Sequence, residues 1–189
     1  MQHSSGPAPE PGWVGEILHF WFEELGAARW FTQSDHTDAL IRKRFLGLHE
    51  RLAAGDGVDR TTGRPLLAAV IVLDQFSRNL FRETPRAFAA DPIARQLARS
   101  AIAQGLDDAM RVQERLFLYL PFEHSEDRAD QALSVELIAR CGNAEWTSYA
   151  LAHKAIIDRF GRFPHRNAIL DRQSTADEVE RLKRREDWF

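Results

Sequence analysis

Apolar residues recur along most of this chain at the three- and four-residue spacing of amphipathic helices. No segment alternates convincingly with the period of two that marks a half-buried strand. The predicted helices run over residues 14–25, 35–53, 66–80, 92–104, 107–120, 127–141 and 144–160, and a last one starts at Thr175. The pattern therefore predicts an all-α fold of about eight helices, most of them joined by short connections.

Local signals mark several ends of these helices. Ser34 or Asp35 is a suitable N-cap for the second helix, and Asp91 before Pro92 predicts an N-cap followed by proline in the first turn. The run Leu66–Leu73 is apolar on every side, so its helix is expected to be central and buried. Pro121 lies where helical periodicity continues, which predicts a kink or a restart of the helix.

Composition narrows the class of protein. The 189 residues fit one domain, expected over residues 13–189 after a flexible lead-in over residues 1–12, with Trp188 and Phe189 folding back onto the core. A formal net charge of −3 gives no field that favours nucleic acid. No apolar run is long enough to span a bilayer. One cysteine, Cys141, excludes an internal disulfide, and a cytoplasmic location is expected.

The stretch Leu116–Gln131 combines an apolar run with ionisable groups. Glu123, His124, Glu126 and Asp127 follow within a few residues of Pro121. A carboxylate near His124 would favour its charged form and fix its tautomer, as in a general acid or base. A structural histidine in an ion-pair network is the alternative.

Two further segments concentrate polar groups. Asp74 and Arg78 lie four residues apart at the end of the buried helix, beside Asn79. Downstream, His153 falls on an apolar helix face, where a structural core histidine is the alternative. The loop 161–167 adds arginines, His165 and an asparagine, and guanidinium groups that converge would bind a carboxylate or phosphate. Pairing of these arginines with the acidic stretch is the competing interpretation.

The sequence gives less support to a metal site or to a nucleophilic side chain. His124, His153 and His165 with Glu123 or Glu126 are acceptable ligands for a divalent metal, but no spacing matches a known metal motif. No cofactor is therefore predicted.

Four blocks of sequence resemble the bacterial Domain of Unknown Function 924 family. They are LDQFSRN (73–79), TPRAFAAD (84–91), YLPFEHSED (119–127) and RFGRFPHRNAIL (159–170), and the resemblance extends over about residues 13–189. It implies stacked antiparallel helices in a right-handed array similar to tetratricopeptide repeats. It implies no established reaction.

These observations lead to one hypothesis and one alternative. The hypothesis is a polar pocket that binds, and acts on, a small anionic molecule. Its catalytic candidates are His124, Glu123 and His165, and its ligand-binding candidates are Asp74, Arg78, Asn79, His153, Arg162, Arg166 and Asn167. The alternative is a helical module that binds a peptide or protein through Trp13, Trp30 and Phe31, with the polar blocks as buried ion pairs. A homodimer is compatible with either.

Overall fold

The computed structural model describes residues 10–183, and every regular element within that range is helical. The all-α prediction is therefore confirmed. Residues 1–9 of the expected lead-in, and Trp188 and Phe189, lie outside the described residues. The tetratricopeptide-like, right-handed arrangement stays a prediction.

The elements follow one another with mostly short connections. They are α1 (Gly12–His19), the π-helical η1 (Phe20–Leu25), the 3-10 turn η2 (Ala27–Arg29), α2 (Asp35–Ala53), α3 (Gly63–Val70), the π-helical η3 (Ile71–Phe76), α4 (Ser77–Leu80), α5 (Arg86–Ala89), α6 (Asp91–Ala103), α7 (Val112–Glu123), α8 (Arg128–Ala139), α9 (Ala144–Phe160), the 3-10 turn η4 (Pro164–Arg166) and α10 (Ala176–Leu182).

The segments α3, η3 and α4 form one helical rod through the centre of the protein, as the apolar run predicts. Each residue from Leu66 to Leu73 is at most 1% exposed. The rings of Phe20, Trp21 and Phe45 surround Phe76 at centroid distances of 5.9, 5.6 and 5.2 Å. Burial on all sides explains why this helix shows no polar face.

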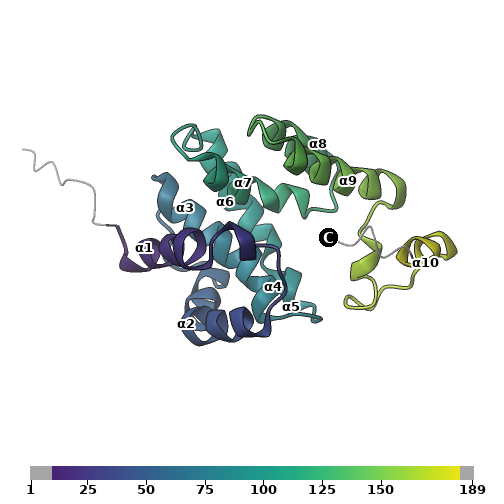
Figure 1. The fold of residues 1–189 in the computed structure, drawn as a ribbon, viewed down its shortest axis with the longest axis horizontal. Helices are drawn as coiled ribbons and strands as arrows, with labels where there is room; N and C mark the ends of the chain where they lie inside the picture. The colour runs from purple at the N-terminus through teal and green to yellow at the C-terminus, as the bar shows by residue number, and fades with distance from the viewer. Residues whose placement is uncertain (1–9, 184–189) are drawn as a thin grey trace, which may run out of the picture.

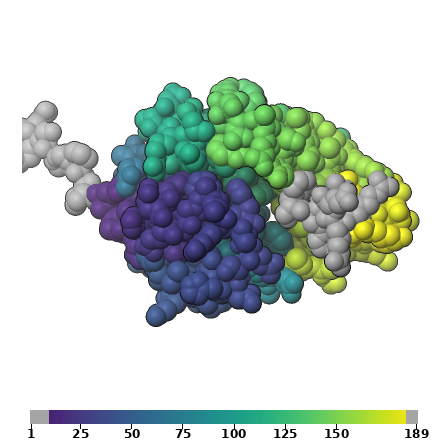
Figure 2. Space-filling view, in the orientation of Figure 1, coloured from purple at the N-terminus to yellow at the C-terminus, as the bar shows by residue number. Residues whose placement is uncertain are grey.

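The other helices pack around this rod (Figure 1). The helix α2 packs on η3 and α4, α3 contacts α6 and α7, and α8 packs between α7 and α9. In the space-filling view of Figure 2, the purple and blue N-terminal helices cover the lower half of one face, and the green α8 and α9 lie above them. The last helix, α10, contacts η4 at the end of the molecule opposite to α1 (Figure 1).

Three local predictions need correction. The helix α7 continues through Pro121 and ends at Glu123, so it neither restarts nor carries the acidic residues onward. It begins at Val112 rather than near residue 107, because Glu114 accepts a hydrogen bond from the backbone N–H of Arg111 at 2.8 Å. Asp91 makes no N-cap hydrogen bond. It lies inside the first turn of α6, and its carboxylate is used elsewhere.

The aromatic cluster gives a test of the core. Phe76→Ala should lower the free energy of unfolding by about 3–5 kcal/mol, because it removes a fully buried ring and leaves a cavity. Leu151→Ala is the control, since Leu151 lies on α9 with 51% exposure and should change stability by less than about 0.5 kcal/mol. Denaturant unfolding of both variants measures the difference, and equal effects would contradict this description of the core.

Candidate functional site

A carboxylate lies inside the central rod. Asp74 in η3 has no exposed side-chain surface, and His124 Nδ1 lies 2.8 Å from its Oδ1. The Gln75 amide donates to the other oxygen at 2.6 Å. Burial alone would raise the pKa of Asp74, but the His124 ring, Arg78 and the Gln75 amide outweigh it and hold that pKa well below its usual range. The ionised carboxylate therefore fixes a proton on His124 Nδ1.

His124 follows the last residue of α7 and has its side chain 19% exposed, so solvent reaches the ring. No described residue forms a hydrogen bond with its second nitrogen, Nε2. A buried carboxylate that orients an imidazole in this way leaves Nε2 as the atom that could exchange a proton with a ligand.

Arg78 links Asp74 to the corner between α5 and α6. Its guanidinium binds both oxygens of Asp91 at 2.7 and 2.9 Å, lies 3.5 Å from Asp74, and also donates to the carbonyl of Ala87. The same group lies over the ring of Phe88, at 4.9 Å from the centroid. The Asp74–Arg78 pair is therefore part of a largely buried network.

Glu123 and His153 form a second pair beside His124. His153 Nδ1 lies 3.2 Å from Glu123 Oε1 and 2.9 Å from the carbonyl of Tyr149. Burial raises the pKa of Glu123 to about 7, with Asp74 adding to the rise and His124 opposing it. Burial lowers the pKa of His153 to about 3. His153 is therefore neutral, and its proton lies between two acceptor oxygens.

Arg166 in η4 is a buried cation of this region. It is 7% exposed, and its guanidinium lies 4.4 Å from the ring centroid of Phe163 and 4.7 Å from that of Phe88. Within residues 10–183, no carboxylate pairs with it, and its buried Nε has no hydrogen-bond partner. Burial, followed by the charge of Arg78, lowers its pKa to about 10, so it stays charged at neutral pH.

His165 completes the group from the neighbouring position of η4. Its ring lies 5.6 Å from that of Phe163. Burial and the charge of Arg166 lower its pKa to about 4, so the ring is neutral. We call the group that these contacts assemble the His124–Arg166 centre, which consists of Asp74, Arg78, Glu123, His124, His153, His165 and Arg166.

Three of the predicted site residues lie outside this centre. Asn79 donates to Asp38 at 2.8 Å and so faces α2. Arg162 binds both oxygens of Glu178 at 2.7 and 2.8 Å, which attaches α10 to the loop before it. Asn167 donates to the hydroxyl of Ser174 at 3.0 Å. The structure thus assigns these three side chains to bracing contacts.

Sequence reasoning also missed participants. Asp91 was interpreted as a helix cap, although it binds Arg78. Phe88 and Phe163 face Arg166 with their rings, and neither was predicted as a site residue, although they lie in the blocks 84–91 and 159–170. Glu126 binds Arg172 through two contacts of 2.7 and 3.0 Å and accepts from the backbone of Phe163 at 2.8 Å. This pair holds the loop that carries His165 and Arg166.

The remaining predictions concern the surface and bound ions. Of the three aromatics proposed for a partner, Trp13 and Trp30 pack against the core, and Phe31 is 66% exposed. Among the described residues, no cluster of three or more His, Cys, Asp and Glu side chains could hold a metal ion. No helix in the same range has the length and apolarity to cross a membrane.

The chain matches a protein family and resembles a solved structure. Residues 17–186 match the model of a family described as a bacterial protein of unknown function (DUF924). A protein of unknown function from Agrobacterium tumefaciens, ATU0120, has a similar structure with a TM-score of 0.85 and 38% sequence identity, over 90% of this chain and 96% of that one. No curated protein matches the chain.

Glu123 gives the centre a defined dependence on pH. Its pKa is about 7 in the folded protein and about 4.5 when unfolded, so the folded state binds more protons between these values and loses stability as pH rises through them. Glu123→Gln should therefore raise the free energy of unfolding at pH 8 by up to about 3 kcal/mol, relative to its effect at pH 4.5. Denaturant unfolding at the two pH values measures this.

Glu126→Gln is the matched control, because its ion pair with Arg172 shifts the pKa the other way. Burial alone would raise the pKa of Glu126, but Arg172 and the backbone N–H of Phe163 lower it. Its contribution to stability is present above the unfolded pKa and is lost as pH falls. Glu126→Gln should therefore destabilise the protein at pH 8. The same sign of change in both variants would contradict these assignments.

Proposed function

The chain belongs to the bacterial DUF924 family, and from the His124–Arg166 centre we propose that it binds a small anionic molecule through a carboxylate or phosphate group on Arg166. One observation carries this proposal. Arg166 is a 7% exposed cation without a carboxylate partner in the described part of the chain. Guanidinium groups bind carboxylate and phosphate oxygens with two parallel hydrogen bonds, so an anion would supply the contacts that Arg166 lacks.

Energetics support a ligand over a purely structural role. A fall in the pKa of Arg166 from 12.5 to about 10 corresponds to a cost of about 3 kcal/mol for keeping the group charged. Buried cations that serve as structural contacts are normally paired, as Arg78 is with Asp91. Within residues 10–183, the contacts of the Arg166 guanidinium are with the faces of Phe88 and Phe163, which stabilise a cation but leave its buried Nε without a hydrogen-bond partner.

The ionised carboxylates around the centre pair with other cationic or imidazole groups, which leaves Arg166 available to a ligand. Asp91 is bound to Arg78, Glu126 is bound to Arg172, and Asp74 is bound to His124. Each of these carboxylates thus has a partner of its own. Among the described residues of the centre, a bound anion would face the unpaired guanidinium of Arg166. The one carboxylate there without a cationic partner is that of Glu123, whose raised pKa keeps a large fraction protonated at neutral pH.

His124 is the group placed to exchange a proton with such a ligand. Asp74 orients its ring, Nε2 is not bonded to a described residue, and the side chain is 19% exposed. His165 and His153 remain neutral and add hydrogen-bonding capacity without charge. The proposed roles are therefore charge recognition by Arg166 and acid or base chemistry by His124.

Sulfate is a suitable probe, because its charge does not change near neutral pH. Sulfate should raise the melting temperature of the wild type above that seen with chloride at equal ionic strength. A ligand present at 100 times its Kd stabilises by about 2.7 kcal/mol. Arg166→Gln should reduce this shift to the general stabilisation that excluded sulfate gives a folded protein. It should not lower the stability of the ligand-free protein, because it removes a buried charge. His124→Ala should weaken sulfate binding while the fold is retained.

Arg162→Gln is the matched control on the same loop. It breaks a two-point ion pair with Glu178, so it should lower stability and leave the sulfate-induced shift unchanged. If the wild type shows no sulfate shift and Arg166→Gln is destabilised like Arg162→Gln, Arg166 is a structural residue and the proposal is wrong. Calorimetric titration with sulfate would confirm the affinities.

A further inference from the structure

The connection between α7 and α8 carries His124, and a side chain of α8 is bonded to it. We call residues 124–127 the α7–α8 corner. Gln131 lies near the start of α8 and has no exposed surface. Its amide nitrogen donates to the carbonyl of Glu123 at 2.6 Å and to that of Ser125 at 2.7 Å. One amide group is therefore bonded to the backbone on both sides of His124.

The chemistry of the amide group determines which way Gln131 points. An amide nitrogen carries two protons, one for each of these carbonyls, whereas an amide oxygen in the same place would be repelled by both. The oxygen of the Gln131 amide is buried and has no hydrogen-bond partner within residues 10–183. An apolar side chain would avoid the free-energy cost of that unpaired oxygen. The contribution of Gln131 to the corner is therefore its two N–H donors.

The carbonyl of Glu123 needs a donor from outside its own helix. The last four carbonyls of a helix have no partner within it, and α7 ends at this residue. Among the described residues, no side chain other than Gln131 donates to the carbonyl of Glu123 or of Ser125. The hydroxyl of Ser125 also donates to Asp130 on α8, at 2.6 Å. The backbone around His124 is thus attached to α8 as one unit.

His124 has its partner on a different element. Its Nδ1 lies 2.8 Å from Asp74 in η3, and this hydrogen bond weakens steeply if the corner moves relative to the central rod. We propose that Gln131 is a positioning residue of the candidate site. Its amide holds the backbone on both sides of His124, which keeps the ring on Asp74 and leaves Nε2 available. This inference rests on the proposed function, in which His124 exchanges a proton with a bound anion.

Gln131→Met tests this role, because methionine has a similar length and shape but no N–H donor. In the ligand-free, full-length wild type, the neutral ring of His124 should carry its proton on Nδ1, and nitrogen-15 NMR distinguishes this form from one protonated on Nε2. In Gln131→Met the Nε2 form should appear beside it. The Nδ1 proton should also exchange with water about tenfold faster, because each lost hydrogen bond favours opening of the corner. The resonance that is missing from His124→Ala assigns the signal.

Tyr119→Phe is the matched control on the same helix. It removes the buried hydrogen bond of 2.6 Å from the Tyr119 hydroxyl to Asp107, so it should lower stability. It touches no residue of the α7–α8 corner. The signals of His124 should therefore be those of the wild type.

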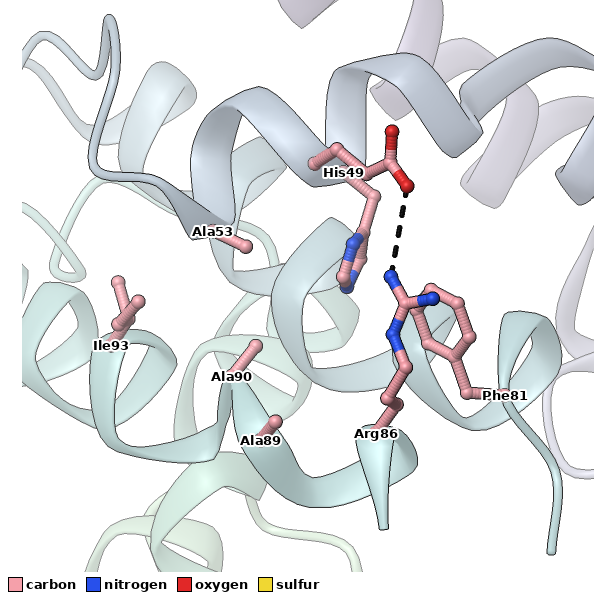
Figure 3. A pocket seen from close by; sticks show the side chains of 8 residues that line it. His49, Ala53, Phe81, Arg86, Ala89, Ala90 and Ile93 are labelled. Carbon is pink, nitrogen blue, oxygen red and sulfur yellow. Dashed lines mark ion pairs between the residues drawn. The ribbon is translucent and has the colours of Figure 1, made fainter. Parts of the chain in front are cut away.

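His49 gives an internal control in the same spectra. It projects from α2 at a pocket of about 260 Å³ beside α5 and α6 (Figure 3), and no residue of the α7–α8 corner lines that pocket. His49 Nε2 lies 2.8 Å from the hydroxyl of Ser77, which donates its own proton to the carbonyl of Leu73 at 2.5 Å. The proton of a neutral His49 ring therefore lies on Nε2, and its signal should be the same in every variant.

Gln131→Asn is the second variant, for use if Gln131→Met does not fold. It keeps the polarity of the amide but is one methylene too short to reach both carbonyls. The proposal is overturned if the wild-type ring of His124 is not protonated on Nδ1, or if the folded variant keeps the wild-type signals. It is also overturned if Tyr119→Phe changes these signals equally, if the His49 signal changes with them, or if neither Gln131 variant folds.

These measurements need no ligand, which separates them from the test of the anion site. A wild type that shows the Nδ1 form but no sulfate shift would contradict the proposed function and leave the positioning of His124 intact. A sulfate shift in the wild type together with unchanged His124 signals in Gln131→Met would contradict only the role of Gln131.

Discussion

The structure depends on a single negative charge, that of Asp74, placed where no solvent reaches it. An isolated carboxylate in such surroundings would cost several kcal/mol, so its partners must be held in place. They come from different parts of the chain. His124 follows α7, and Arg78 lies in α4, where Asp91 at the start of α6 holds its guanidinium. Burial of Asp74 therefore sets the relative positions of the central rod, α6 and the end of α7. Loss of one partner would leave the carboxylate with the other partner and the Gln75 amide, and would lower stability.

Much of the fold could be predicted, because the buried positions of a helix recur periodically in the sequence. The apolar run Leu66–Leu73 identified the buried helix, and the Ser34 cap placed the start of α2. The amphipathic spacing after Asn143 predicted α9. Gly161, which has a left-handed backbone conformation, ends that helix. A restart at Pro121 was expected, but α7 continues through it for two more residues and ends at Glu123.

The candidate site was predictable as a set of segments but not as a set of contacts. A carboxylate partner was foreseen for His124, yet it comes from Asp74, fifty residues earlier, and not from the acidic residues beside it. Arg162 and Arg166 are alike in type and lie on the same loop, but one binds Glu178 and the other lies between phenylalanine rings. Packing of distant helices decides such pairings, and local spacing carries no information about it. His49 escaped notice for the same reason, since only the tertiary structure brings Ser77 to it.

Ser77 and Arg78 are consecutive residues of one short helix, yet they face different neighbours. Ser77 contacts His49 beside the pocket, and Arg78 contacts Asp74 and Asp91 in the His124–Arg166 centre. Because the two residues are consecutive, a displacement of this turn would move both contacts together. This turn therefore ties the hydrogen bond of His49 to the surroundings of the carboxylate inside the rod.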